Sequence, residues 1–454
     1  MPNTAIETNK STRVRDFNNA LNRGVPTSPI RLMLNALHPA EIAHIIESLT
    51  PDKREIIWEL VDPEFEGDVL LHVGDEVRAS LIKKMETEDI ISATEGMDLD
   101  DLADFMQDVP SSVYKAIIQS MDDQSRLRLE TVMSFPEDTA GGLMNTDTIA
   151  IRPDVTLDVV MRYLRRQNEK IPENTDSLIV VDHHNKYLGT LSLADLVSND
   201  PTLRVSEVYK QEPEGITATM QETQVAHIFT DHDLISAPVV NEQGILLGRI
   251  TIDDVVDVIR DDAEHSLMSM AGLDEDNDMF APVISSSMRR AVWLGVNLLT
   301  ALMASAVIGV FEATLEKVVA LAVLMPIVAS MGGIAGSQTL TLVIRGLALG
   351  QIGFTNAKSL LIKEIAVSLL NGALWSIIVG CISIFWFGDI ILGLIIGAAI
   401  IINLIIGAVS GIGIPLLLKQ LHIDPALAGG VVLTTITDVI GFLAFLGLAT
   451  IILI

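Results

Sequence analysis

One carboxylate, Asp438, lies in the middle of a long apolar segment near the end of the chain. The segment from Ala426 to Ile454 is long enough to cross a bilayer, and Asp438 comes 12 residues after its start. At ~1.5 Å per residue this places the carboxylate ~18 Å along a helix, near the bilayer midplane. A charge at that depth costs roughly 2.5 kcal/mol or more, so such residues usually face a bundle interior or an aqueous path. Asp438 therefore indicates an ion or proton pathway; the alternative is an acid held by a neighbouring helix for structure alone.

A second acid, Asp424, stands just before this segment, in the sequence Asp-Pro-Ala. On a helix turning ~100° per residue, Asp424 and Asp438 lie within ~40° of one face and ~21 Å apart. We expect Asp424 at the mouth of the path and Asp438 deep inside it. Thr434 and Thr435 share the face of Asp438, and their hydroxyls are candidates to line the path, although threonine bonds its own backbone at least as often.

Apolar length predicts five membrane spans. Arginine and lysine residues cluster on one set of connections: Arg289 and Arg290 before the first span, Arg345, Lys358 and Lys363 around the second connection, and Lys419 between the last two. By the positive-inside rule the N-terminal half is cytoplasmic and the C-terminus lies outside. The predicted spans are Ala291–Val310, Val318–Leu349, Leu360–Phe387, Ile390–Leu418 and Ala426–Ile454.

The second span carries Pro326 and the run Gly332-Gly-Ile-Ala-Gly336, which we expect to interrupt its helix. Gly332 and Gly336 are spaced for close helix packing, while a proline frees a backbone carbonyl. Gln338 in the same span and Asn403 in the fourth are polar groups at membrane depth. Each is either a pore-lining residue or a hydrogen bond between helices.

The composition divides the chain of 454 residues into two halves. From Ser285 onward six acids meet seven bases, so the residues before Ser285 carry a net charge of −30 and the rest of the chain carries +1, which together give −29. Such self-repulsion makes divalent metal a natural ligand and nucleic acid an unlikely one; ordinary acidic solubility is the alternative. The lone Cys381 excludes a disulfide framework, and the polar first thirty residues do not read as a signal peptide.

The N-terminal half contains a repeat. Residues 180–195 match residues 239–254 at a shift of 59, with Val180, Gly189 and Asp195 falling on Val239, Gly248 and Asp254. Each copy predicts two short strands and a helix capped by Ser192 or Thr251. The pattern resembles a tandem pair of CBS domains, which implies a regulatory module that senses a nucleotide or a metal.

The region from Leu37 to Ala140 before the repeat is helical in pattern, with breaks at Thr50-Pro51, Asp62-Pro63 and Val109-Pro110. It predicts a small superhelical domain. Acids gather at Asp98, Asp100, Asp101 and Asp104, and again in the second repeat and its exit. Most such acidic runs are solvated surfaces. The presence of several acidic runs in one half of the chain indicates instead that metal binding controls the positions of the domains.

Together with the repeats, four motifs resemble the MgtE family of magnesium channels over nearly the whole chain from about Leu32: Phe135-Pro-Glu-Asp-Thr-Ala-Gly-Gly-Leu-Met144, Gly332-Gly-Ile-Ala-Gly-Ser-Gln338, Asp424-Pro-Ala426 and Thr437-Asp438. The resemblance implies a multi-domain chain with an α-helical superhelical N domain, tandem α/β CBS domains and a five-span α-helical bundle. The implied boundaries are a flexible tail over 1–31, the N domain over 32–136, CBS domains over 137–200 and 201–262, a connecting "plug" helix over 263–284 and the transmembrane domain over 285–454.

The same resemblance implies a homodimer in a plasma or inner membrane, with Asp438 of two copies holding hydrated Mg2+ at the dimer axis and Asp424 near the cytosolic mouth. It also implies cytosolic Mg2+ ligands at Asp100, Asp104, Asp231, Asp254 and Asp257. This chain departs from the family in having Ile334 where asparagine is frequent, and Arg260, His265 and Ser266 where acids are frequent.

The sequence thus predicts a magnesium channel that cytosolic Mg2+ closes by joining the acidic domains. The rival is a CBS-regulated secondary transporter of another divalent cation or solute. We find no nucleophile and base pairing, phosphate loop or zinc-ligand spacing, so an enzyme is not expected. Transport of Mn2+ or Co2+, and binding of ATP at the CBS domains, remain open.

Overall fold

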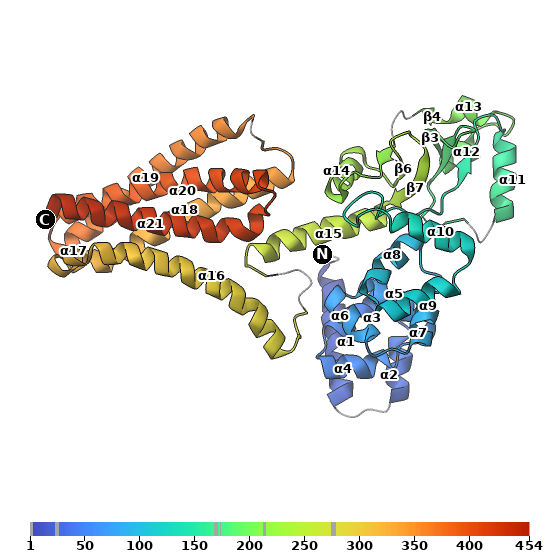
Figure 1. Ribbon diagram of the computed structural model, residues 1–454, viewed down its shortest axis with the longest axis horizontal. Helices are drawn as coiled ribbons and strands as arrows, with labels where there is room; N and C mark the ends of the chain where they lie inside the picture. The colour runs from blue at the N-terminus through green and yellow to red at the C-terminus, as the bar shows by residue number, and fades with distance from the viewer. Residues whose placement is uncertain are drawn as a thin grey trace. The chain divides into compact units, whose positions relative to one another are not determined.

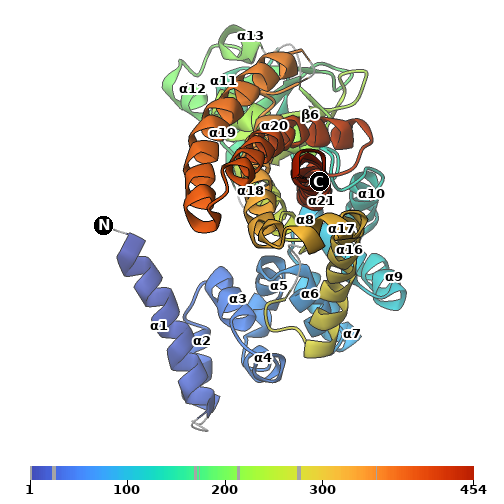
Figure 2. The same ribbon diagram turned by 90° about the vertical axis from the view of Figure 1, so that its left-hand side faces the viewer.

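A computed structural model describes residues 3–22, 27–167, 171–172, 174–211, 215–273, 278–353 and 355–453 (Figures 1 and 2). The chain forms two compact units. One comprises residues 1–263 with 276–281, and the other comprises residues 264–275 with 282–454.

The described residues of the N domain form ten helices, and several of their starts follow local capping rules. Asp62 accepts a hydrogen bond from the Glu64 amide at 3.4 Å, Asp122 accepts one from the Gln124 amide at 2.8 Å, and Pro51 and Pro63 stand at the first helical positions. The predicted breaks are therefore helix starts. The helices are α1 Asn3–Asn22, α2 Thr27–Leu34, α3 Pro39–Glu47, α4 Pro51–Trp58, α5 Pro63–His72, α6 Asp75–Ile82, α7 Thr87–Thr94, α8 Leu99–Asp108, α9 Ser111–Ser120 and α10 Asp123–Val132.

These helices pack in succession: α3 on α5, α5 on α7, α7 on α9 and α8 on α10. Each layer covers the apolar side of the previous one, and their buried leucine, isoleucine and valine residues join one continuous core. This is the superhelical arrangement that the sequence predicted.

The predicted flexible tail over 1–31 is wrong for the residues that the structure describes; residues 1–2 and 23–26 lie outside them. Helices α1 and α2 cover most of this range, and Phe17 and Ile30 are each only 3% exposed. Val14, Phe17 and Leu21 recur at helical spacing and pack on the N-domain core. Burial of this apolar stripe outweighs the polar composition that suggested disorder.

The two CBS units share a three-strand topology, to which the first unit adds the short edge strand β4, Lys210–Gln211. In each sheet a short parallel strand precedes an antiparallel hairpin, and the register pairs Ser177 with Ser192 in one copy and Ser236 with Thr251 in the other, a shift of 59. The predicted cap is confirmed, since the Ser192 hydroxyl accepts a hydrogen bond from the Asp195 amide at 3.0 Å. The elements are β1 Ala150–Ile151, α11 Leu157–Gln167, β2 Ser177–Val181, β3 Tyr187–Ser192, α12 Leu193–Ser198, α13 Val205–Val208 and β4 Lys210–Gln211, then β5 Ile216–Thr217, α14 Glu222–His232, β6 Ser236–Val240, β7 Leu246–Thr251 and α15 Ile252–Ser269.

Two reciprocal hydrogen bonds join the copies. The Tyr187 amide donates to the Gly244 carbonyl and the Leu246 amide donates to the Asn185 carbonyl, both at 2.9 Å. Each bond becomes the other under the shift of 59, so the tandem pair has a pseudo-twofold axis at this point.

The junction after the N domain, assigned by sequence to the first CBS domain, is bonded to the second. The Ala140 amide donates to Met220 at 2.7 Å, the Gly141 amide donates to Ala218 at 2.9 Å, and Asn145 pairs with Arg249. A Cβ on Gly141 would come within 2.3 Å of the Phe135 ring, so the glycine permits this close approach. The N domain and the second CBS domain consequently share one core.

The predicted connecting helix over 263–284 has different bounds. Helix α15 begins inside the second CBS domain at Ile252 and ends at Ser269, and the next helix begins after Pro282. Residues 274–277 of this range lie outside the described residues. The turn at Ala271-Gly272, where Gly272 has φ +68°, and the proline at the following helix start explain why no single helix spans the range.

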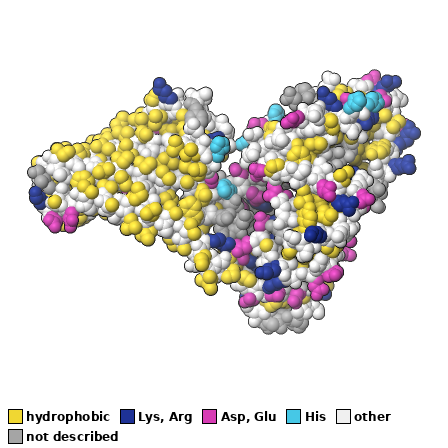
Figure 3. All heavy atoms as spheres, viewed as in Figure 1, with side chains coloured by type: hydrophobic (Ala, Val, Ile, Leu, Met, Phe, Trp, Pro, Cys, Tyr) yellow, Lys and Arg dark blue, Asp and Glu magenta, His cyan; other side chains and the backbone are white. Residues whose placement is uncertain are grey.

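Within the part of the chain that the structure describes, five helices are long and apolar enough to cross a membrane, which confirms the predicted number of spans. Hydrophobic side chains dominate their surface on the face shown in Figure 3, whereas acidic side chains gather on the other unit. A short helix, α17 Glu312–Lys317, connects the first two. The spans are α16 Val283–Val310, α18 Ala320–Ala348, α19 Ala357–Phe387, α20 Ile390–Gln420 and α21 Pro425–Leu453.

Helix α18 runs without a break through Pro326 and the glycine run, contrary to the expected interruption. The glycines serve packing instead. A Cβ on Gly407 of α20 would lie 2.9 Å from the Gly332 carbonyl oxygen, and one on Gly411 would lie 2.8 Å from that of Gly336. The backbones of α18 and α20 therefore touch, which is the close packing that the glycine spacing predicted.

Candidate metal sites

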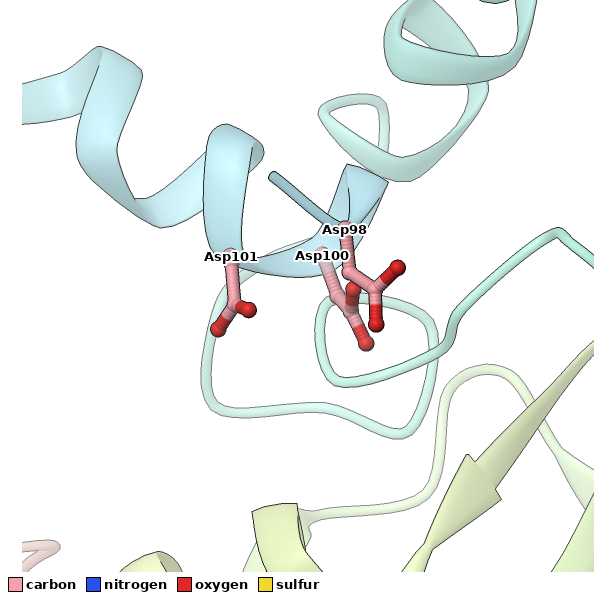
Figure 4. A group of neighbouring side chains, drawn as sticks. All are labelled: Asp98, Asp100 and Asp101. Carbon is pink, nitrogen blue, oxygen red and sulfur yellow. The ribbon is translucent and has the colours of Figure 1, made fainter. Parts of the chain in front are cut away.

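Three carboxylates lie together at the start of α8. One oxygen each from Asp98, Asp100 and Asp101 falls within 4.8 Å of the others. The side chains leave the first turn of the helix on the same side (Figure 4). The run Asp-Leu-Asp-Asp produces this cluster because Asp98 is the residue preceding α8 and the other two occupy its first turn.

The protein environment opposes ionisation of this cluster. Burial, followed by the charge of Asp254, raises the pKa of Asp100 to about 8. Burial and then Asp253 raise the pKa of Asp254 to about 7, and burial and then Asp98 raise that of Asp101 to about 6. Acids of the N domain and of α15 thus raise one another's pKa across the seam between the N domain and the second CBS domain.

Asp100 is the least solvated member. It is 8% exposed, and its buried Oδ1 has no hydrogen-bond donor among the described residues. A buried carboxylate oxygen without a donor is costly, and a hard divalent cation with oxygen ligands would satisfy it. The cluster therefore fits Mg2+ better than it fits bare carboxylates.

Asp254 and Asp257 both lie on α15, but their partners differ. Asp254 accepts hydrogen bonds from the Thr251 hydroxyl at 3.0 Å and the Thr251 amide at 3.3 Å. Asp257 forms an ion pair with Arg260 at 2.9 Å, while burial still raises its pKa. Arg260 thus supplies a positive charge beside one of the predicted ligands.

Asp104 is not part of the group of three carboxylates, although the charge of Asp101 also raises its pKa. It lines a cavity of about 420 Å³ together with Glu137, Asp138 and Phe135. Burial, and then the charge of Glu137, raises the pKa of Asp104 to about 7. Asp104 is nevertheless exposed to solvent, because it lines the wall of this cavity. The structure thus brings Asp104 together with Glu137 rather than with Asp100.

Asp231 is exposed near the end of α14. It is not among the charges that dominate the raised pKa values of Asp100, Asp104, Asp254 or Asp257. Of the five cytosolic residues that the sequence singled out, Asp100, Asp254 and Asp257 gather at one seam, whereas Asp104 and Asp231 do not.

Asp438 lies halfway along α21 and is partly buried. The nearby threonine hydroxyls donate to their own helix: Thr434 to the Gly430 carbonyl at 2.9 Å and Thr435 to the Val431 carbonyl at 2.7 Å. Their oxygens can still accept from a water molecule. Thr434 is exposed on the single chain, as expected for a residue that faces a path or a partner.

Asp424 caps α21. Its carboxylate accepts hydrogen bonds from the Ala426 amide at 2.8 Å and the Leu427 amide at 3.3 Å. The Nε2 atom of His265, on α15, lies 3.1 Å from Asp424 Oδ2. The predicted mouth residue therefore also fixes a helix start and contacts the end of the connecting helix.

Asn403 joins three helices inside the bundle. It is fully buried, and its Nδ2 donates to the Val328 carbonyl of α18 at 2.8 Å. A Cβ on Gly332 or Gly441 would come within 2.2 or 2.7 Å of Nδ2. Of the two alternatives, the hydrogen bond between helices is the one that this geometry shows. Gln338 and Ile334, by contrast, are exposed on α18 of the single chain.

Glu364 is a buried carboxylate that sequence reasoning missed. It lies in α19, is 6% exposed, and accepts a hydrogen bond from the Thr339 hydroxyl of α18 at 3.3 Å. Lys363 lies 3.2 Å from it. The neighbouring lysine made this position look like the charged end of a span, although a carboxylate inside an apolar segment was the available signal.

Comparisons with known proteins match the chain along most of its length. A family model described as a divalent cation transporter matches residues 325–448, one described as the MgtE intracellular N domain matches residues 37–138, and the CBS domain model matches residues 140–201 and 205–261. The Thermus thermophilus protein named magnesium transporter MgtE is 30% identical over 433 residues, covering 94% of this chain and 96% of that protein.

The Bacillus subtilis protein of the same name is 28% identical over 421 residues, which cover 92% of this chain and 93% of that protein. A crystal structure described as the cytosolic domain of the Mg2+ channel MgtE in complex with ATP is 31% identical, with a TM-score of 0.49, and covers 54% of this chain and 99% of that one.

With its five apolar helices, the chain is a multi-pass membrane protein whose N-terminal half is cytoplasmic. Its relatives are transport proteins, which is not an enzyme class. The full-length match to the Thermus protein and the matched domain models together make this chain a member of the MgtE family of magnesium transporters.

Proposed function

We propose that this protein is an Mg2+ channel of the cell membrane that cytosolic Mg2+ closes. The observation that carries the gating part is Asp100, a buried carboxylate with an unsatisfied oxygen, clustered with two further acids and facing Asp254. Membership in the family supports Mg2+ as the transported ion.

The cluster acts as a sensor because its acids repel one another when no cation is bound. Two like charges ~4 Å apart raise the energy by ~4 kcal/mol at an effective dielectric constant near 20. A bound Mg2+ makes the net electrostatic interaction attractive, and it holds the N domain against the second CBS domain. When cytosolic Mg2+ falls, repulsion among Asp100, Asp101 and Asp254 favours separation, and the population shifts to an open state.

Asp438 is the proposed ion site of the pore. One carboxylate is too little charge for a closed Mg2+ cage, whereas two related by a homodimer axis supply −2 to a largely hydrated ion. The exposed Thr434 and Gln338 are proposed to face this path. Asp424 is proposed to attract cations at its cytosolic mouth. Selection among Mg2+, Mn2+ and Co2+ would depend on how tightly this site holds the hydrated ion.

The rival function is secondary transport of another divalent cation or solute. Flux into liposomes separates the two. A channel takes up Mg2+ without a sodium or proton gradient and loses the flux in Asp438→Ala, while a coupled transporter requires the gradient. Uptake that persists in Asp438→Ala would exclude the proposed pore site.

The gating test is Asp100→Asn in the same liposomes, with Mg2+ varied on the cytosolic side. We expect inhibition by cytosolic Mg2+ to weaken while flux at low cytosolic Mg2+ stays near wild type. Unchanged inhibition in Asp100→Asn and Asp254→Asn alike would refute the sensor. We also propose, from the tandem CBS pair alone, that ATP binds the cytosolic half, which calorimetry on the full chain tests directly.

A further inference from the structure

The segment between α15 and α16 is attached to the N domain. Residues 278–281 belong to the first compact unit, although they immediately precede the first transmembrane helix. Asp278 is the anchor. Its carboxylate forms a paired contact with Arg54 of α4, with Arg54 Nη1 to Oδ2 at 2.5 Å and Nη2 to Oδ1 at 2.6 Å.

The pair is buried. The side chains of Arg54 and Asp278 are 4% and 7% exposed, whereas those of the Lys84–Glu55 pair in the same domain are 53% and 51% exposed. A two-point contact between guanidinium and carboxylate is both strong and specific in orientation. Removing one partner would leave the other as a buried, uncompensated charge.

Further bonds fix both ends of the contact. Arg54 Nε donates to the Ile46 carbonyl at 2.9 Å and Nη2 donates to the Glu47 carbonyl at 3.1 Å, so the guanidinium is held at the end of α3. On the other side, the Asp278 amide donates to Glu76 at 2.8 Å and the Phe280 amide donates to Asp278 Oδ1 at 2.9 Å. The end of α3 thus fixes the Arg54 side chain, while Glu76 fixes the backbone of Asp278.

Only residues 279–281 separate this contact from Pro282, the residue that caps α16. The four residue steps from Asp278 to Pro282 span at most ~14 Å when extended, so the start of α16 cannot move far from the place where the N domain holds Asp278. The C-terminal end of α15 belongs to the unit of the membrane helices, where His265 Nε2 lies 3.1 Å from Asp424 Oδ2. The chain therefore joins that unit at two places, at the end of α15 and again at Pro282.

We propose that Arg54 and Asp278 are positioning residues that couple the N domain to α16, so that the metal-dependent position of the N domain acts on the first transmembrane helix directly and not through α15 alone. This inference rests on the proposed gating by cytosolic Mg2+. It adds a second path for the signal, with its own residues.

The test compares full-length Asp278→Asn with wild type in liposomes. The asparagine keeps the size of the side chain but removes its charge. We expect half-inhibition to require about fivefold more cytosolic Mg2+, the lower end of typical coupling between linked sites, while flux at low cytosolic Mg2+ is unchanged. Arg54→Lys keeps the charge and loses the paired geometry, so its shift should be intermediate. Lys84→Ala, which breaks the exposed pair in the same domain, should behave as wild type.

A second readout does not depend on transport. Chymotrypsin cleavage after Phe280, followed by mass spectrometry of the full chain, reports whether the segment is held. Met279 is 90% exposed, so the site is reachable once the segment loosens. We expect faster cleavage in Asp278→Asn and Arg54→Lys, and a wild-type rate in Lys84→Ala.

The outcomes separate the two proposals. A wild-type protein that cytosolic Mg2+ does not inhibit would remove the proposed gating, while the cleavage rates would still show whether the attachment exists. Faster cleavage with unchanged half-inhibition would overturn the coupling role, and unchanged cleavage in Asp278→Asn would overturn the attachment itself.

Discussion

Asp100 shows how a single residue can make a fold depend on a metal. Its pKa of about 8 lies above the ordinary value of 3.8, so between these values the folded protein holds a proton that the unfolded chain has released. Stability from this group is therefore full below pH ~4, and it falls as pH rises to about 8 in the absence of a cation. Asp254 and Asp104, both with pKa of about 7, act in the same direction.

We predict that Asp100→Asn stabilises the metal-free protein at pH 8. The asparagine removes a charge whose burial costs on the order of a few kcal/mol, since each pKa unit corresponds to about 1.4 kcal/mol. Thermal unfolding of the full chain in detergent with EDTA, at pH 5 and pH 8, measures the effect. The variant should melt several degrees higher at pH 8 and by a smaller margin at pH 5, which lies only about one unit above the ordinary pKa of 3.8.

Glu130→Gln on the exposed side of α10 is the matched control and should change neither value. Lower stability of Asp100→Asn at pH 8 without metal would show that the ionised carboxylate is satisfied in the fold. Burial of the acid could not be read from the run Asp98 to Asp101, because an identical run on a free surface would remain solvated.

At the scale of the element, Asp424 has a role that its motif did not reveal. Its two backbone contacts cap α21, and loss of such a cap costs ~1 kcal/mol. We predict that Asp424→Ala lowers thermal stability, whereas Asp424→Asn retains the cap and melts near wild type. If Asp424 also attracts cations, liposome Mg2+ flux should fall in both variants. A flux defect confined to Asp424→Ala would assign the residue to helix capping alone.

The joint of α18, α20 and α21 depends on glycine as much as on asparagine. A methyl group on Gly441 would meet the buried amide of Asn403, while one on Gly447 of the same helix would meet no atom within 4 Å. We predict that Gly441→Ala destabilises the bundle by ~1–3 kcal/mol and that Gly447→Ala does not. Size-exclusion profiles and melting temperatures in detergent distinguish the two variants.

A rescue makes this test specific. Asn403→Ala in the Gly441→Ala background removes the clash, so the double variant should recover stability relative to Gly441→Ala. Additive losses would mean that the two residues do not share the joint. Gly332 and Gly336 were recognised from spacing, but the partner at Gly332, Asn403, lies in another helix and had no signal in the sequence beyond its polarity.

The predicted helix positions were correct where local sequence rules determine them and incorrect where packing against distant residues determines them. The five spans and the caps at Asp62 and Ser192 follow from apolar length and capping chemistry. Helices α1 and α2 were not predicted because Val14, Phe17 and Leu21 lie among polar residues. These three side chains are stabilising only when they pack on a core that later helices supply. The observed bounds of α15 differ from the predicted ones because the linker was identified by its acidic residues, and the turn at Ala271-Gly272 was not used to place the end of the helix.

At the scale of the whole molecule, the negative net charge is concentrated in the cytoplasmic half. Repulsion among these charges destabilises the compact state, so bound cations are needed to stabilise it. Specific bridging and general screening predict different salt responses. We expect a few mM MgCl2 to raise the melting temperature of the full chain far more than NaCl at the same ionic strength, because the Debye length, ~30 Å at 0.01 M, is the same for both. Equal effects of the two salts would indicate screening without a bound ion.

The family, the domain order and the acid clusters could be predicted from motifs, since these are local or repeated. The pairing of these acids could not be predicted. Asp104 lies one turn from Asp100 in sequence, yet it lines a cavity with Glu137, and the Arg54–Asp278 contact joins residues 224 positions apart. Such pairings depend on how the N domain folds against the later chain.

The most direct measurement is divalent current in excised patches while the cytosolic Mg2+ concentration is stepped. The account predicts a wild-type Mg2+ current that falls as cytosolic Mg2+ rises, a current that persists at high cytosolic Mg2+ in Asp100→Asn, and no current in Asp438→Ala. A wild-type current indifferent to cytosolic Mg2+, or an undiminished current in Asp438→Ala, would contradict it.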